Sequence, residues 1–320
     1  MSGTRVLLDL MGGVALLLWG LHMVQSGILR AYGTELSGQL ARRLGRRMPA
    51  FLAGMGLTAI LQSSTATALM TASFVAQGAV ALAPALAVML GANVGTTLIV
   101  QVLAFDISAA APVLLVAGLI AFRIGPQSRL KDLGRVAIGL GLMLLALHIL
   151  LASLAPAEEA PGMRILLRAA TRDPTLAIGL GAVLAAAAHS SVAVVLLTMS
   201  LAFSNFVPLP AAFAIVLGAN LGTAITPVFE GTRRGDAASY RLPLGNLLNR
   251  LLGVLVFAPF LPAIAAWLST IQPDAAKATA WFHLAFNLAM AALFLLVLPP
   301  LARALERLLP ARGATDPTAP

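Results

Sequence analysis

Cysteine is absent from this sequence, and charged and large aromatic residues are scarce. Of the 320 residues, 10% are charged, three are Trp and two are Tyr. Without cysteine the chain has no disulfides, no thiolate metal ligands and no cysteine nucleophile. So few Trp and Tyr residues leave no stacking platform for bases, and we do not expect a nucleic acid as a partner.

Apolar residues dominate the composition of the chain. They make up 59% of the chain and give a mean hydropathy of +0.93, whereas soluble domains are about 45–50% apolar and about 25% charged. A water-soluble core cannot bury this much apolar surface, which excludes a soluble enzyme. The net charge of +9 fits cytoplasmic loops, where membrane proteins collect Lys and Arg. We therefore predict an all-α polytopic membrane protein.

Seven apolar stretches are candidates for membrane-spanning helices, each of which needs about 20 mostly apolar residues. We interpret the first as a retained helix, because no small-residue cleavage site follows it. The seven stretches are Val6–Leu29, Leu82–Phe105, Ala109–Phe122, Leu133–Leu154, Phe206–Phe229, Leu242–Leu268 and Thr279–Leu298.

Two further apolar stretches, 49–79 and 174–203, carry polar residues at their centres. Each half is about a dozen residues long, too short to cross a bilayer alone and suited to a re-entrant hairpin. With both stretches as hairpins, fifteen Lys and Arg residues of the loops fall on one side. With both as full spans, nine helices result and the basic loops are split. We therefore predict about seven spans plus two hairpins in the cell (inner or plasma) membrane, with a cytoplasmic C-terminus and an extracytoplasmic N-terminus.

Two polar motifs occur twice at one constant spacing. Gln62-Ser63-Ser64 precedes Gly91-Ala92-Asn93-Val94-Gly95-Thr96-Thr97, and His189-Ser190-Ser191 precedes Gly218-Ala219-Asn220-Leu221-Gly222-Thr223-Ala224, with corresponding residues 127 positions apart. The predicted hairpins enter from opposite sides, so the repeats are expected to be inverted, each with a broken membrane helix, as in secondary transporters. The alternative is that the glycines only allow close helix packing.

The same pattern divides the chain into four predicted parts. A first transmembrane repeat with the N-terminal helix covers 1–154, and an extracytoplasmic linker covers 155–173. A second transmembrane repeat covers 174–312, and a disordered tail covers 313–320.

With these motifs, and with Phe282-His283-Leu284-Ala285-Phe286-Asn287 near the end, the sequence resembles the sodium/phosphate cotransporter family over nearly its whole length. The resemblance implies sodium-coupled movement of inorganic phosphate. The chain departs from the family pattern at His189, where Gln is usual, and at Arg250, where Asn is usual. We expect no PhoU-like helical domain after the last span, as in a short bacterial branch of the family with some members linked to export, so the transport direction stays open.

Hydroxyl residues begin the second half of each predicted hairpin: Ser63, Ser64 and Thr65 in the first, Ser190 and Ser191 in the second. A helix N-terminus offers free N–H groups and partial positive charge, which suit an anion. We expect both ends to converge on one phosphate. The alternative is that these hydroxyls only cap or back-bond their helices. Arg250 either contacts phosphate through two N–H groups or extends to the membrane interface.

Few ionisable side chains lie at the predicted midplane, chiefly His189 and Arg250. Amide, hydroxyl and backbone oxygens suit a hard cation there, which favours sodium over a proton as the coupling ion; no other metal or cofactor is expected. His189 either replaces an amide or senses pH. The candidate sodium or cavity residues are Gln62, Asn93, Thr96, Thr97, His189, Asn220, Thr223, His283 and Asn287.

Three functions fit these residues to different degrees. A secondary transporter of phosphate is the first, and arsenate, sulfate or a phosphonate are alternative substrates. A selective channel also uses rings of hydroxyl and carbonyl groups. An intramembrane hydrolase built on His189 and Ser190 or Ser63 lacks an Asp partner, so we do not expect an enzyme. The expected partners are phosphate, sodium and the lipid bilayer, with a homodimer left open.

Overall fold

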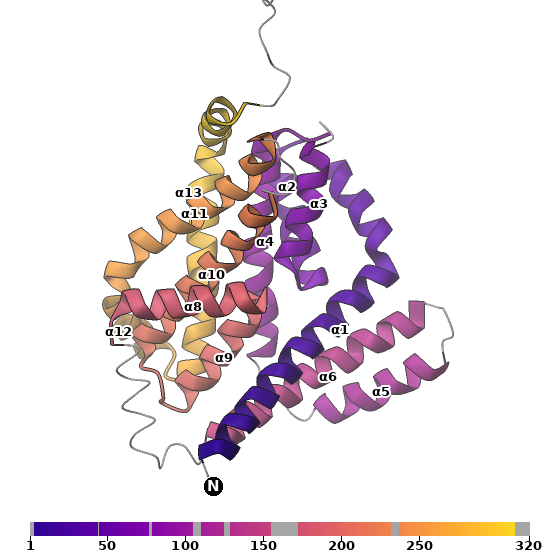
Figure 1. Ribbon diagram of the computed structural model, residues 1–320, viewed down its shortest axis with the longest axis vertical. Coiled ribbons are helices and arrows are strands. Elements are labelled where there is room, and N and C mark those ends of the chain that lie inside the picture. Colours follow the sequence, from indigo (N-terminus) through magenta and orange to yellow (C-terminus); the bar gives the residue numbers. More distant parts are fainter. Residues whose placement is uncertain are drawn as a thin grey trace, which may run out of the picture.

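The computed structural model describes residues 3–43, 45–76, 79–104, 110–124, 129–154, 172–231 and 237–310 (Figure 1). Throughout these ranges the regular structure is helical, with no strand, which confirms the predicted all-α class. Six of the helical segments in the described ranges are long and apolar enough to cross a membrane. They are Leu8–Leu36, Leu82–Leu103, Arg129–Leu150, Leu209–Phe229, Ala237–Ile271 and Ala275–Leu308.

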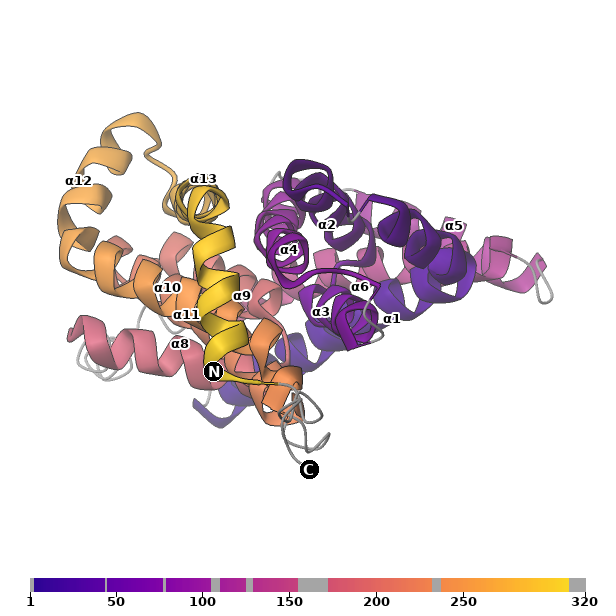
Figure 2. The ribbon, with the colours of Figure 1, turned by 90° about the horizontal axis from the view of Figure 1, so that it is seen from above.

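The helices α1 (Gly3–Arg43), α5 (Ala110–Ile124) and α6 (Arg129–Leu154) form one flank of the molecule (Figures 1 and 2). α1 crosses α6 where two glycines meet, because a Cβ at Gly20 would lie 2.7 Å from the carbonyl oxygen of Gly139. α5 has 15 residues, or about 22 Å at the α-helical rise. It is shorter than the roughly 30 Å hydrocarbon core, so it is absent from the six long segments although a span was predicted there.

Each apolar stretch with a polar centre forms two short helices joined at a left-handed residue. The first comprises α2 (Arg47–Leu61) and α3 (Ser64–Ala76), and the second comprises α8 (Pro174–Ala188) and α9 (Ser191–Phe203). The breaks fall at Gln62 (φ 53°, ψ 27°) and His189 (φ 49°, ψ 26°). A left-handed backbone is costly for residues other than glycine. The same costly conformation therefore recurs 127 positions along the chain.

The helix that follows each pair packs against its first member through glycine. α2 packs against α4 (Leu82–Leu103), and α8 packs against α10 (Leu209–Gly231). A Cβ at Gly91 would overlap the carbonyl oxygen of Phe51, and a Cβ at Gly218 would overlap that of Ile178. The contacts are equivalent, since Phe51 and Ile178 are also 127 positions apart. The motif glycines thus serve close packing, the alternative considered for them.

The two helix pairs extend toward opposite ends of the molecule. In Figure 1, α2 and α3 lie toward the end where α13 (Ala275–Leu308) finishes, whereas α8 crosses the middle of the view and α9 extends toward the end where α1 begins. α8 starts after Asp173, whose carboxylate accepts a hydrogen bond of 2.7 Å from the backbone N–H of Thr175. Most of the predicted linker 155–173 and all of the predicted tail 313–320 lie outside the described residues.

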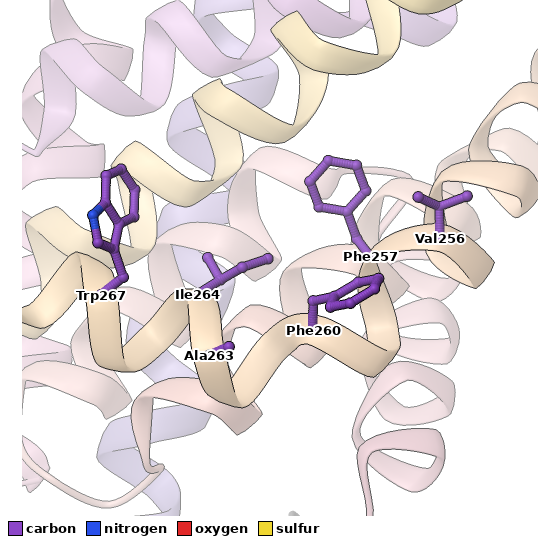
Figure 3. A pocket seen from close by; sticks show the side chains of 6 residues that line it. All are labelled: Val256, Phe257, Phe260, Ala263, Ile264 and Trp267. Carbon is purple, nitrogen blue, oxygen red and sulfur yellow. The ribbon is translucent and has the colours of Figure 1, made fainter.

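The predicted span Leu242–Leu268 is interrupted. It forms α11 (Arg241–Phe257), a 3₁₀ turn at Ala258–Phe260 and α12 (Leu261–Ile271). An open groove of about 430 Å³ lies along this bend (Figure 3). Because its lining is apolar, this face suits contact with lipid chains. The lining residues are Val256, Phe257, Phe260, Ala263, Ile264 and Trp267.

Two prolines interrupt the backbone hydrogen bonds of α13, at Pro299 and Pro300. Proline has no N–H, so Pro299 cannot bond to the carbonyl four residues earlier. That carbonyl belongs to Leu295, and the Arg47 guanidinium donates a hydrogen bond of 2.9 Å to it. The start of α2 is thereby attached to the bend of α13.

We predict that Gly54→Ala and Gly181→Ala each lower stability by about 1–3 kcal/mol through overpacking. A Cβ at either position would overlap a backbone carbonyl of the next long helix, at Val88 or Ile215. Gly56→Ala and Gly179→Ala on the same two helices are controls, since a Cβ there meets nothing within 4 Å. Thermal unfolding in detergent measures the effect, and equal melting temperatures in all four variants would contradict the packing model.

Candidate functional site

The centre of the candidate site is the Arg250 side chain on α11, which is 4% exposed. Its guanidinium donates hydrogen bonds to Asn93 Oδ1 on α4 and to the backbone carbonyl of Asn220 on α10. A third bond of 3.0 Å reaches Thr223 Oγ1. One cation therefore joins both copies of the duplicated motif. Its burial contradicts the alternative in which Arg250 extends to the membrane interface.

The sequence of α11 places this cation on a polar face of an otherwise apolar helix. Asn246, Asn249, Arg250 and Gly253 are all buried, and their spacing of three, four and seven residues puts them on one side. Asn246 Oδ1 accepts a hydrogen bond of 3.3 Å from Asn93 Nδ2. Gly253 lets Phe286 of α13 approach, since a Cβ there would lie 2.9 Å from Phe286 Cζ. α11 is thereby held against both α4 and α13.

α13 supplies the corresponding contact to the second motif. Asn287 Nδ2 donates to Asn220 Oδ1 at 3.3 Å and to the carbonyl of His283, one turn earlier, at 2.9 Å. Each motif asparagine, Asn93 and Asn220, therefore pairs with an asparagine from a later helix. The structure thus brings together six predicted site residues, which are Asn93, Asn220, Thr223, Arg250, His283 and Asn287.

No carboxylate balances the Arg250 charge in the part of the chain that the structure describes. The ion pairs there are Arg129–Glu35, Arg135–Asp132 and Lys277–Asp274, and none involves α4 or α10. Neutral oxygens accept the guanidinium hydrogen bonds, which leaves a net positive charge. A buried cation without a counter-ion is unfavourable. The site is therefore suited to receive an anion.

The predicted hydroxyl residues lie at the N-termini of α3 and α9. Ser63 Oγ accepts a hydrogen bond of 3.1 Å from the N–H of Ala66, and Ser190 Oγ accepts one of 3.1 Å from that of Ala193. Both serines therefore cap their helices, as the alternative supposed. α3 and α9 each contact α4 and α10, and Ser191 is buried whereas Ser64 and Thr65 are half-buried. No hydrogen bond joins these residues to Arg250 in the described contacts.

The remaining predicted residues have different surroundings in the two copies. Gln62 is half-buried and its Oε1 is buried without a hydrogen-bond partner in the described structure, whereas His189 is exposed. The hydroxyls of Thr96 and Thr97 bond back to carbonyls of their own helix, at 2.7 Å each. Among the described hydrogen bonds, none joins either threonine to Arg250.

Several contributing residues lie outside the set of site residues predicted from the sequence. Gln25 of α1 donates a hydrogen bond of 3.0 Å to the carbonyl of Gln62, which holds the first break in place. Asn246 bonds to Asn93, and Asn249 next to Arg250 has a buried Oδ1 with no donor in the described structure. The spacing of Asn246, Asn249 and Arg250 in an apolar helix is the signal that could have identified them.

Comparison with known proteins gives one family across most of the chain. The family model described as "Na+/Pi-cotransporter" matches residues 16–152 and 157–298. The "Putative inorganic phosphate export protein YjbB" of Escherichia coli K12 is 40% identical over 297 residues, covering 93% of this chain and 54% of the relative. The protein of that name from Salmonella typhimurium is 41% identical over 282 residues, covering 88% and 52%.

A third relative is close to this chain in length. "Uncharacterized protein YqeW" of Bacillus subtilis is 29% identical over 307 residues, covering 96% of this chain and 99% of the relative. The chain spans about half the length of the YjbB relatives. No solved structure matches the sequence.

We predict that Arg250→Met separates stability from anion binding. Methionine removes a buried charge that has no counter-ion, which is favourable, and leaves Asn93 Oδ1 without its donor, which is unfavourable. Because these two effects oppose each other, the melting temperature of the anion-free protein should change little, while stabilisation by added phosphate is lost. Arg307→Lys on the exposed last turn of α13 is the control and should keep that stabilisation. A Met variant that phosphate still stabilises would contradict the assignment.

Proposed function

The chain belongs to the Na+/Pi-cotransporter family, and we propose that it moves inorganic phosphate across the membrane by alternating access, coupled to sodium. The family description and the names of relatives indicate a transporter rather than an enzyme. The observation that carries the proposal is Arg250, a buried cation with no carboxylate partner in the described structure, bonded to both copies of one motif. Phosphate would supply the missing negative charge.

The hydroxyl-bearing helix ends complete the proposed phosphate site. α3 begins at Ser64 and α9 begins at Ser191, and both helices contact the two motif helices. Their free N–H groups and partial positive charge favour an oxyanion without adding a fixed charge. Arg250, Ser63, Ser64, Thr65, Ser190 and Ser191 would then contact phosphate together.

Alternating access is proposed from the duplication. The two broken hairpins share one backbone conformation at Gln62 and His189, and in Figure 1 the first extends toward the end where α13 finishes and the second from the middle toward the end where α1 begins. We infer that the repeats are inverted and that the hairpins are re-entrant from opposite sides. Arg250 contacts both repeats, so a motion of one against the other would open the phosphate site to each side in turn.

Sodium coupling is proposed from the neutral oxygens around the site. Gln62 Oε1 is a buried acceptor without a donor in the described structure, and such oxygens suit a hard cation. Asn93 Oδ1 and the Asn220 carbonyl accept hydrogen bonds from Arg250. In this conformation these two oxygens are therefore not available to sodium. Sodium would add positive charge beside a phosphate that carries more than one negative charge.

The orientation of the chain, the membrane in which it lies and its oligomeric state are also proposals. The positive-inside rule places the C-terminus in the cytoplasm and the N-terminus outside an inner or plasma membrane, and a homodimer is compatible with the exposed apolar faces. The direction of phosphate transport can be measured. The family description implies entry with sodium, whereas the printed name of the YjbB relatives implies exit.

Flux of labelled phosphate into sealed vesicles tests the function. With sodium on one side only, we expect saturable uptake that stops when choline replaces sodium, and the reversed gradient measures the opposite direction. Ohmic phosphate current that does not saturate would favour a channel. Saturable phosphate flux that does not depend on sodium would refute sodium coupling but would not contradict the proposed phosphate site.

We predict that Ser63→Ala and Ser191→Ala each reduce phosphate flux about tenfold, the cost of one hydrogen bond to a charged group. Ser269→Ala is the matched control, because Ser269 is exposed on α12 and bonds to the carbonyl of Ala266 in its own helix. Measuring phosphate binding to these variants in detergent distinguishes a loss of affinity for phosphate from a loss of folded protein. Full flux in both site variants would contradict the placement of phosphate at the hairpins.

A further inference from the structure

We propose that the polar centre around Arg250 selects oxyanions that carry a hydroxyl hydrogen, such as hydrogen phosphate and arsenate, over sulfate, and that Asn249 determines this specificity. The inference rests on the proposed phosphate transport. It adds a residue outside the predicted site and narrows the class of substrate.

The inference starts from buried polar atoms without hydrogen-bond partners. Six such side-chain atoms occur in the described structure, and four of them belong to Asn249, Arg250 and His283. They are Asn249 Oδ1, Arg250 Nε and both ring nitrogens of His283. Buried polar groups are almost always paired, so a cluster of unpaired ones requires an explanation. A polar ligand that pairs with them all is the simplest explanation.

The three residues belong to one connected network. Arg250 follows Asn249 directly on the buried face of α11, and Arg250 bonds to the carbonyl of Asn220. Asn220 bonds through Oδ1 to Asn287, which in turn bonds to the carbonyl of His283. The residues that carry the unpaired atoms therefore lie on α11 and α13, two helices that contact each other and both motif helices.

The unpaired atoms include both hydrogen-bond donors and acceptors, and this combination favours some tetrahedral anions over others. Arg250 Nε donates, Asn249 Oδ1 only accepts, and an uncharged imidazole has one donor and one acceptor. Hydrogen phosphate and arsenate present oxygens that accept and hydroxyl groups that donate. Sulfate at neutral pH presents acceptors only, so Asn249 Oδ1 would stay unpaired beside it. A site built to pair with a ligand hydroxyl rejects an analogue without it.

Asn249 suits this role better than its polar neighbours. The oxygens of Asn246 and Asn220 already accept bonds from Asn93 and Asn287. Asn249 Oδ1 is unengaged and belongs to the buried residue that precedes Arg250 on α11. An aspartate there would form an ion pair with Arg250 and reduce the attraction for an anion. A neutral amide accepts the hydroxyl hydrogen and leaves the charge of Arg250 for the anion.

Competition against labelled phosphate in vesicles containing the full chain tests the proposal. In the wild type, arsenate should compete about as well as phosphate, and sulfate should need at least about a hundredfold higher concentration. In Asn249→Leu, which keeps the volume but removes the acceptor, phosphate affinity should fall about tenfold and the preference over sulfate should shrink by a similar factor. Ser200→Ala removes another unpaired buried oxygen, on α9, and should change neither value.

The outcomes separate this inference from the proposed function. Wild-type sulfate competition as strong as that of arsenate would overturn the selectivity, and this measurement needs no variant to fold. Unchanged selectivity in a folded Asn249→Leu protein would overturn the role of Asn249. Saturable phosphate flux would survive either result. If phosphate itself neither binds nor moves, the proposed function fails, and with it this inference.

Discussion

A single buried guanidinium organises the polar centre of this protein. Arg250 bonds to Asn93 in the first motif and to Asn220 and Thr223 in the second. In the described structure no acidic side chain accompanies it. Hydrocarbon surroundings make an unbalanced charge unfavourable, so the arrangement is understandable only if the charge has a use. The asparagine pairs on either side hold the cation in place without neutralising it, which is the condition that the proposed anion site requires.

The scaffold around this charge is built from one unit used twice. Gln62 and His189 share a left-handed backbone, and the glycines of α4 and α10 allow the same close approach to α2 and α8. The side chains at the two breaks differ, since Gln62 is half-buried and His189 is exposed. The backbone is thus duplicated more faithfully than the chemistry that it carries.

Much of the architecture could be predicted from the sequence, because membrane helices follow from hydropathy and the repeat follows from a constant spacing of 127 residues. The breaks at Gln62 and His189 fell where polar residues interrupt apolar runs. The bounds predicted for α5, Ala109–Phe122, were close to the observed ones, but its 15 residues are fewer than a full span needs. The bend at Ala258–Phe260 was missed, because hydropathy does not report where a helix turns inside the bilayer. The bonds of Arg250 were also out of reach. They join residues about 30 to 160 positions apart, and no local pattern encodes such contacts.

The proline pair of α13 has a mechanical consequence. Pro299 leaves the Leu295 carbonyl to be bonded by Arg47, an exposed side chain at the start of α2. An exposed hydrogen bond is inexpensive to exchange for one to water, so this attachment can detach and re-form with little loss of free energy. Beyond the prolines α13 stays packed on α11, since Ala302 and Leu305 are buried and Arg241 Nε donates a hydrogen bond of 2.8 Å to the Leu309 carbonyl. The first hairpin is therefore joined to α13 by an exposed bond that can open, whereas α11, which carries Arg250, is joined to α13 by buried contacts.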